Sequence, residues 1–279
     1  MKTRSLLTAA VTLLIVFMSC DKVVENTYVT EYVVDDPIYA FAFISTEYYY
    51  YYSQYYSVAD VVVNNYDTVP EITINGIPPN NPYYYDFDYN DTIFLPGTKC
   101  DLRIKVGSRV IEGTAYVPRT FDVIQPAENE TVTGTDLNIR WSSAGSDHYE
   151  VYVEYHFHDD ANMCHWDYFI EPAVKDTTLS KAGFLPTVTP GSTWYYGFIG
   201  ITAIDGPPLT PGTPANITGD GGGFLWTYNY CWGSYFNVAG SPMTPMQPDP
   251  NARRIYPARV KADIRNRMAQ AGMPVNPEE

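Results

Sequence analysis

The run from Tyr149 to Phe157 restricts the fold more than any other stretch, because apolar and polar side chains alternate strictly along it. The apolar positions are Tyr149, Val151, Val153, Tyr155 and Phe157, and the positions between them are Glu150, Tyr152, Glu154 and His156. A period of two is typical of a β-strand with one buried face, since successive side chains of a strand point to opposite sides. We therefore expect a long strand with one face in a core.

Alternation recurs elsewhere, separated by turn signals. The segment Leu137 to Trp141 alternates, and so does Cys100 to Val106, which would turn Cys100 into a core as a buried thiol. Asn75-Gly76 is a pair strongly favoured in tight hairpin turns. The glycines from Gly219 to Gly223 are expected to form a loop, with an aromatic strand after them. The sequence thus predicts an all-β fold.

The stretch from 121 to 238 carries the features of a known family of sandwiches. Trp141 lies on the expected second strand, a Pro190-Gly191 turn precedes the aromatic strand at Trp194, and a further alternating strand ends at Asp205-Gly206. In these features it resembles fibronectin type III and related immunoglobulin-like domains. The resemblance implies a β-sandwich and says almost nothing about activity, because many functions occur on this scaffold.

The chain is expected to divide into five parts. After a signal at 1–19 and a tether at 20–36, two sandwiches would follow in tandem: an immunoglobulin-like, Tyr-rich domain at 37–119 and a fibronectin III-like domain at 120–240. Residues 241–279 would form a proline-rich linker and a basic C-terminal helix, in which Val260, Ile264 and Met268 are four residues apart. That helix could bind an acidic partner or remain a solvated tail.

The first twenty residues indicate export. Lys2 and Arg4 precede an apolar run that is too short to span a bilayer. Phe17 to Cys20 resembles the lipobox of bacterial lipoproteins, which implies that Cys20 carries acyl chains such as palmitate and anchors the protein to the outer membrane, on its periplasmic or cell-surface face. The alternative is an ordinary signal peptide cleaved near Ser19.

Charge excludes one class of partner. Removal of residues 1–19 takes away two basic groups, so 15 basic side chains remain against 32 acidic ones, a net charge of −17. Nucleic acid is therefore not expected to bind.

Three cysteines remain besides Cys20, an odd number that allows at most one disulfide. The favoured pair is Cys164 with Cys231, since both lie in the second expected domain.

The tyrosine-rich stretch is the most unusual part of the composition. A run of identical residues cannot alternate, so some rings must face solvent or a partner, and tyrosine rings suit contacts with protein or stacking on sugars. A tyrosine-rich loop or edge strand folded over its own sheet is the alternative. The expected contact residues are Tyr48, Tyr49, Tyr50, Tyr51, Tyr52, Tyr55 and Tyr56.

Two groups of side chains could act as metal ligands. His156 and His158 share a strand face, and His165 follows on the far side of an expected hairpin turn, so these three could hold zinc or copper. A solvated histidine-rich loop is the alternative. Asp86, Asp88 and Asn90 have the spacing of a calcium loop, but the glycine and glutamate that such a loop requires are missing. Solvated carboxylates are therefore favoured there, and no cofactor is expected.

No serine elbow, metalloprotease helix, usable nucleotide loop or convincing pair of catalytic carboxylates is present, so the chain is not expected to be an enzyme. The first hypothesis is a lipid-anchored surface protein that binds a protein partner or a neighbouring copy. The second is glycan binding, because Pro126 to Val153 also resembles the immunoglobulin-like modules of surface lipoproteins for polysaccharide uptake.

Overall fold

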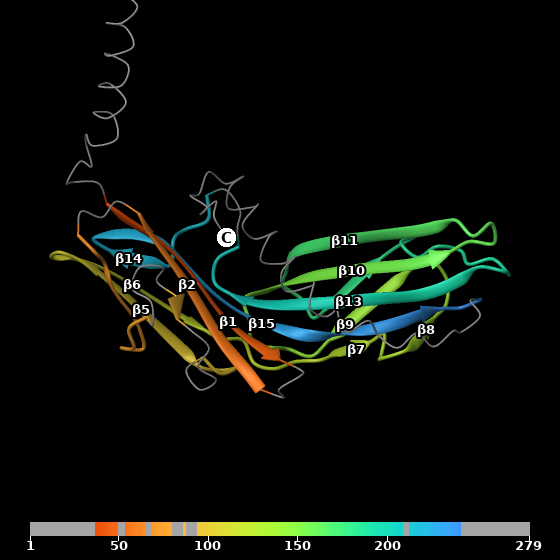
Figure 1. Ribbon diagram of the computed structural model, residues 1–279, viewed down its shortest axis with the longest axis horizontal. Coiled ribbons are helices and arrows are strands. Elements are labelled where there is room, and N and C mark those ends of the chain that lie inside the picture. The colour runs from red at the N-terminus through yellow and green to blue at the C-terminus, as the bar shows by residue number, and fades with distance from the viewer. Residues whose placement is uncertain are drawn as a thin grey trace, which may run out of the picture.

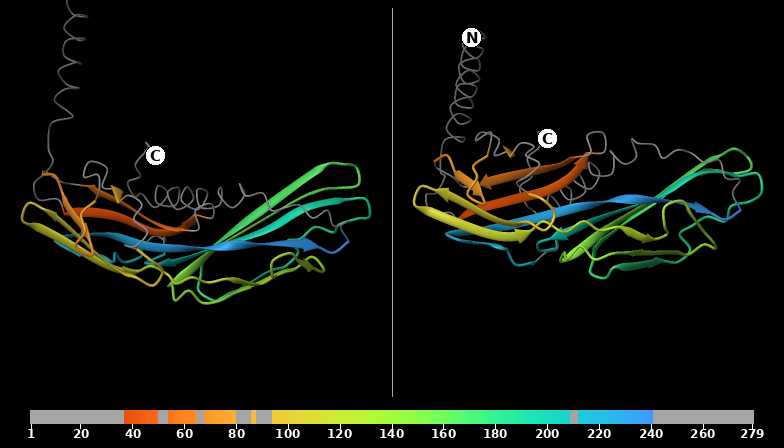
Figure 2. Two further views of the ribbon diagram at one scale, coloured as in Figure 1. Left: turned by 60° about the horizontal axis from the view of Figure 1, so that its bottom comes forward. Right: turned by 90° about the horizontal axis from the view of Figure 1, so that it is seen from below.

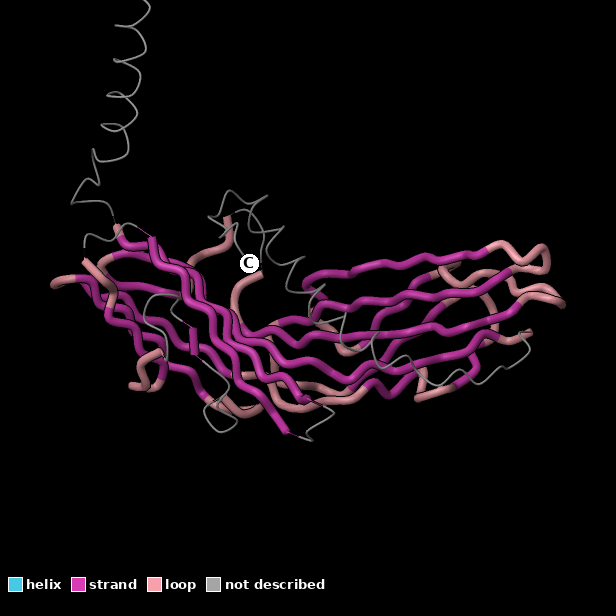
Figure 3. The backbone as a smooth tube through the Cα atoms, viewed as in Figure 1, coloured by secondary structure: helices cyan, strands magenta, loops and turns pink. Residues whose placement is uncertain are grey.

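The computed structural model describes residues 37–49, 54–64, 68–79, 86–87, 94–208 and 212–240, which form an all-β structure (Figures 1 and 3). Twelve strands make one sheet and three make a second. The large sheet contains β1 (Ile38–Tyr49), β2 (Gln54–Asn64), β3 (Glu71–Ile74), β4 (Asp86–Phe87), β5 (Lys99–Val106), β6 (Arg109–Tyr116), β8 (Glu130–Val132), β10 (His148–His158), β11 (Cys164–Val174), β13 (Thr193–Asp205), β14 (Ile217–Gly219) and β15 (Gly221–Val238). The small sheet contains β7 (Val123–Gln125), β9 (Leu137–Trp141) and β12 (Thr178–Lys181).

The described strands form two halves, with β1 to β6 and β14 in the first and β7 to β13 in the second, and β15 runs through both (Figure 2). Its first part pairs with β1 in parallel, from Ile38 opposite Gly221 to Thr46 opposite Asn229. Its second part pairs with β13 in antiparallel fashion and with β8 in parallel. One strand therefore contributes side chains to the cores of both halves.

The first core contains the inward faces of β1, β2, β3, β5 and β6. The expected alternation of β5 is confirmed, because Cys100, Leu102 and Ile104 are buried between exposed neighbours. Asn75 and Gly76 both have positive φ, as the expected tight turn requires. Ile217 of β14 and Leu225 of β15 also belong to this core.

The second core lies between the two sheets. Trp141 and Leu137 of β9 face Val151 and Val153 of β10 across it, and Phe236 is contributed by β15. Trp141 packs edge-on against Tyr149 with ring centroids 5.4 Å apart. The expected alternation of β9 is thus confirmed, and so is the inward face of β10.

The outer face of β10 differs from the expectation of one buried face, because Glu150, Tyr152 and Glu154 are also buried. The reason is a continuous, mostly aromatic set of side chains on the side of the large sheet that faces away from both cores. We call this set the outer aromatic face; its buried members are Phe41, Tyr152, Phe198, Ile204, Trp226, Tyr228 and Tyr235.

Side chains of β13 and β15 join the two halves at their boundary. Thr227 and Asn229 of β15 donate to the backbone carbonyl oxygens of Tyr116 and Pro118, at 2.6 and 3.0 Å. The carboxylate of Asp205 accepts the backbone N–H of Tyr116 at 2.6 Å. Burial is the main reason that the pKa of Asp205 lies above its usual value.

The expected division at residues 119 and 120 does not match the distribution of the strands. β14 and the beginning of β15 belong to the second sandwich in the expected division, but they pack in the first core. Gly221, Gly222 and Gly223, expected in a loop, are strand residues that pair with β1. Side chains there would collide with that strand, since a Cβ on Gly221 or Gly223 would overlap a carbonyl oxygen of Ile38 or Ala40.

Several sequence predictions fall outside the described residues. They concern the signal and tether at 1–36, the tail at 241–279, Tyr50 to Tyr52, and residues 88–90 of the proposed calcium loop. Tyr48 and Tyr49 end β1, and Tyr55 and Tyr56 lie in β2, with Tyr48 opposite Tyr55. Within the described part of the chain, no helix has the length and apolar character needed to cross a membrane.

A strand shared by two cores should make them unfold together. Leu225→Ala in the first core is expected to lower the free energy of unfolding by about 2–5 kcal/mol, and Phe236→Ala in the second by about 3–5 kcal/mol. Alkylation of Cys100 during urea unfolding reports on the first core, and alkylation of the buried Cys231 reports on the second.

Each substitution should move both signals by the same amount. The control is Val69→Ala, because Val69 is exposed. This substitution should change the free energy of unfolding by less than about 0.5 kcal/mol. A variant that moves only the signal of its own core would show that the halves unfold independently.

Candidate functional site on the β10–β11 hairpin

The β10–β11 hairpin is closed by a short turn that Asp159 organises. The backbone of Asp159 donates to the carbonyl of Met163 at 3.0 Å, and its carboxylate accepts the N–H groups of Ala161 and Met163 at 3.0 and 2.8 Å. Asn162 takes a positive φ of 61°, which asparagine tolerates better than most residues. This turn fixes the register, so that His158 lies opposite Cys164.

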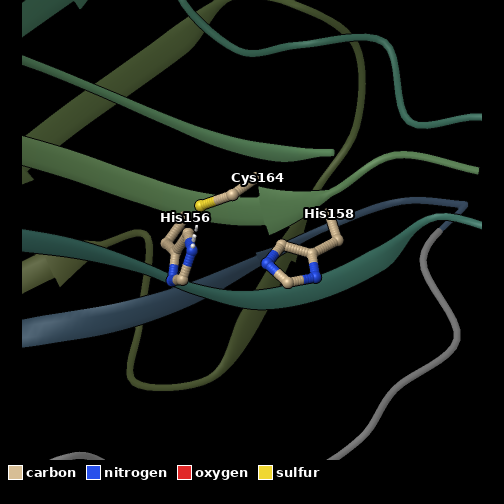
Figure 4. Close-up of side chains that lie close together, drawn as sticks. All are labelled: His156, His158 and Cys164. Atoms are coloured by element: carbon tan, nitrogen blue, oxygen red, sulfur yellow. Dashed lines mark hydrogen bonds between the residues drawn. The ribbon is translucent and has the colours of Figure 1, made fainter. Parts of the chain in front are cut away.

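That register brings two imidazoles and a thiol together on the outer face of the hairpin (Figure 4). The Nε2 atom of His156 lies 2.9 Å from the Sγ atom of Cys164. One potential ligand atom from each of His156, His158 and Cys164 lies within 4.8 Å of the others. We call these three side chains the His-Cys cluster.

His165 does not belong to this cluster, so the structure does not bring the expected set of His156, His158 and His165 together. His165 lies opposite Phe157 and therefore projects to the inner side of the hairpin. Its ring stacks on Phe157 at 4.8 Å, and its Nε2 atom lies 2.8 Å from a carboxylate oxygen of Asp159. The hydrogen bond from His165 is the main cause that lowers the pKa of Asp159.

Tyr195 of β13 holds both histidines of the cluster in place. Its ring stacks on His156 at 4.8 Å with an interplanar angle of 19°. Its hydroxyl lies 3.2 Å from Nδ1 of His158, and the side-chain oxygen of Asn162 lies at the same distance from that nitrogen. Nδ1 of His158 therefore has hydrogen-bond partners, and the second ring nitrogen is left for the cluster.

The imidazole of His156 is biased towards its neutral form. Partial burial is the largest cause that lowers its pKa, and repulsion from His158 adds to it. A neutral imidazole has a lone pair available, which is the form that binds a metal ion.

An exposed aromatic pair continues along the same face of β11. Trp166 and Tyr168 are 51% and 48% exposed, and their ring centroids are 4.9 Å apart. Tyr168 lies opposite Glu154, whose carboxylate accepts hydrogen bonds from Tyr152 and, at 3.4 Å, from Tyr196. Among the described strands, β11 pairs only with β10 and so forms an edge of the large sheet.

The expected disulfide between Cys164 and Cys231 is not formed, and neither cysteine is part of a disulfide. Cys164 pairs with His158, whereas Cys231 pairs with Ile201, which lies opposite Val151. Seven strand residues separate those positions along β10, about 23 Å, while a disulfide needs Cα atoms within about 7 Å. Cys231 also faces the second core.

The sequence predicts an aromatic contact surface at Tyr48 to Tyr52, Tyr55 and Tyr56, and it does not single out the exposed pair Trp166 and Tyr168. The alternation of β10 could have located them, because a short turn after His158 places every second residue of the next strand on the same face. Which residues of β11 share that face depends on the length of the turn, and the sequence does not specify that length.

No family model, curated protein or solved structure matches this chain. Fold and site define an all-β protein whose edge hairpin presents a His-Cys cluster beside an exposed aromatic pair. Its function has to be inferred from those side chains.

The three described thiols should differ sharply in reactivity. Iodoacetamide is expected to modify Cys164 in the folded protein, because that residue is exposed, and to leave Cys100 and Cys231 untouched. Burial raises the pKa of Cys100 to about 12, which suppresses its thiolate as well as its access. Peptide mass spectrometry would locate the label, with urea-unfolded protein as the control. Equal labelling of Cys231 and Cys164 in the folded state would contradict this arrangement.

Proposed function

We propose that this protein is a non-catalytic surface lipoprotein that binds a protein partner through the exposed face and edge of β11. The observation that carries the proposal is the pair Trp166 and Tyr168, two large rings half exposed on an edge strand. Tryptophan and tyrosine are enriched among the residues that dominate binding energy at protein interfaces.

The strand itself adds a second means of recognition. Along the described part of the sheet, β11 has a paired side towards β10 and an outer side without a neighbouring strand. An extended segment of a partner can add to such an edge through backbone hydrogen bonds, while pockets between side chains provide specificity. Met163, 61% exposed at the tip of the hairpin, extends the apolar surface.

The lipid anchor is inferred from the sequence alone. The lipobox-like segment ending at Cys20 implies acylation, and residues 21–36 lie between that cysteine and the first sheet. Sixteen residues could reach at most about 55 Å when fully extended. A folded region held at such a distance from the bilayer is well placed to meet partners at the membrane surface.

Glycan binding is the second candidate, and the same two rings favour it. With centroids 4.9 Å apart and planes inclined by 31°, the rings of Trp166 and Tyr168 stack partly on each other, and about half of each residue remains exposed to solvent. Exposed aromatic rings of this kind suit stacking on sugar rings.

Replacing both rings should separate binding from folding. In pull-downs from cell-envelope extracts, Trp166→Ala/Tyr168→Ala is expected to weaken capture of a partner by about 30-fold or more, the loss typical of interface residues worth about 2 kcal/mol. Tyr116→Ala, at a 53% exposed tyrosine of β6, is the matched control and should retain capture.

A glycan array with the same variants distinguishes the two candidates. Sugar binding that disappears in the double variant and persists in Tyr116→Ala would establish the second function instead of the first. Unchanged capture by the double variant would refute the proposed role of β11.

The lipid anchor has its own test. Cys20→Ser should move the protein from the membrane fraction to the soluble fraction, because the acyl chains provide the apolar area that binds the bilayer. Mass spectrometry of the wild-type N-terminal peptide should show a modified Cys20. Membrane retention of the Cys20→Ser protein would contradict acyl anchoring.

A further inference from the structure

We propose that the His-Cys cluster binds a divalent zinc ion at the tip of the β10–β11 hairpin. The ligands are His156 and His158 from β10 and Cys164 from β11. This site is independent of the partner surface proposed above, because it depends on different side chains.

The donor set has the chemistry that zinc prefers. Imidazole nitrogen and thiolate sulfur are its common protein ligands, and three protein ligands with one open position are typical of sites that exchange a water or another ligand. Hard cations such as calcium and magnesium select oxygen ligands instead. The cluster thus selects a borderline-soft transition ion.

The distances fit a single ion. Bond lengths of about 2.3 Å to sulfur and 2.0–2.1 Å to nitrogen place neighbouring ligand atoms of a tetrahedral site ~3.5 Å apart. The His156–Cys164 separation of 2.9 Å is somewhat shorter, and the other separations in the cluster do not exceed 4.8 Å. Side-chain rotations that open the His156–Cys164 separation by about 0.6 Å and shorten the others by at most about 1.3 Å would seat the ion without moving the strands.

The side chains are held in place before any ion arrives. Both histidines project from a long strand paired on both sides, and Cys164 lies directly opposite His158 in the register. Tyr195 and Asn162 lie at hydrogen-bond distance from Nδ1 of His158, as outer partners of ligating histidines commonly do. In Figure 4 the other ring nitrogen of His158 lies on the side of His156 and Cys164.

The surroundings suit a cation. The buried carboxylate of Glu154 precedes the cluster on the same strand face, and its charge acts on His156. Cys164 is exposed, so an ion can enter from solvent. The open fourth position would face the same exterior, where water or a side chain of another molecule could complete the coordination.

Zinc uptake can be measured directly on the untagged full chain. The protein is reduced, treated with a chelator, exchanged into metal-free buffer and titrated with zinc chloride in competition with a chromogenic zinc indicator. One equivalent of zinc should bind to the wild type. Cys164→Ser and His156→Ala should each weaken that binding by at least about 100-fold, since loss of a mere outer partner already costs about 10–100-fold.

Two variants serve as comparisons. His165→Ala removes a neighbouring histidine on the opposite side of the hairpin and should leave zinc affinity unchanged. Tyr195→Phe removes the hydroxyl beside Nδ1 of His158 and should weaken binding by about tenfold, as expected for a positioning residue. Thermal unfolding of each apo-variant checks that the fold persists.

A second readout reports on the thiol itself. Bound zinc should protect Cys164 from iodoacetamide, and cobalt substituted for zinc should give a sulfur-to-metal absorption band that disappears in Cys164→Ser. Failure of the wild type to take up zinc, or zinc uptake that Cys164→Ser does not weaken, would overturn the proposal. Stronger uptake of copper than of zinc, with the same dependence on Cys164, would overturn the choice of metal.

Discussion

The structure depends on one strand that has to satisfy two cores. At 18 residues, β15 is about three times as long as an average strand and spans about 60 Å. Leu225 points into the first core and Phe236 into the second, while Trp226 and Tyr235 lie on the outer aromatic face. Both faces of β15 are therefore packed along most of the described strand, and the two halves cannot move as separate domains without breaking it.

The parallel contact between β1 and β15 explains the glycines at the beginning of β15. The contact brings Gly221 and Gly223 against the carbonyl oxygens of Ile38 and Ala40, where a side chain would collide with the backbone. From the sequence, these glycines resemble a loop, since glycine is common in loops and rare inside strands. Their partner lies more than 180 residues earlier in the chain, and no local pattern reveals a pairing of that range.

Local alternation was sufficient to predict the parts of the fold that bury one face. It placed Cys100 and Leu102 in a core, and it assigned Val151 and Val153 to the inner side of β10. It did not predict that Glu150 and Tyr152 are also buried, because that burial depends on side chains of other strands. Pattern arguments describe one strand at a time, whereas the outer aromatic face exists only after β1, β10, β13 and β15 are aligned.

At the candidate site, too, the pattern of a single strand was not enough to identify every residue. The alternation of β10 correctly put His156 and His158 on one face, but the choice between Cys164 and His165 depended on the turn. Asp159 closes that turn by accepting two backbone N–H groups, and this register places the thiol opposite His158 and the imidazole opposite Phe157. A shift of one residue would exchange the two, because neighbouring side chains of a strand point to opposite faces. The chemistry of the hairpin tip is thus decided by the hydrogen bonds of a single aspartate.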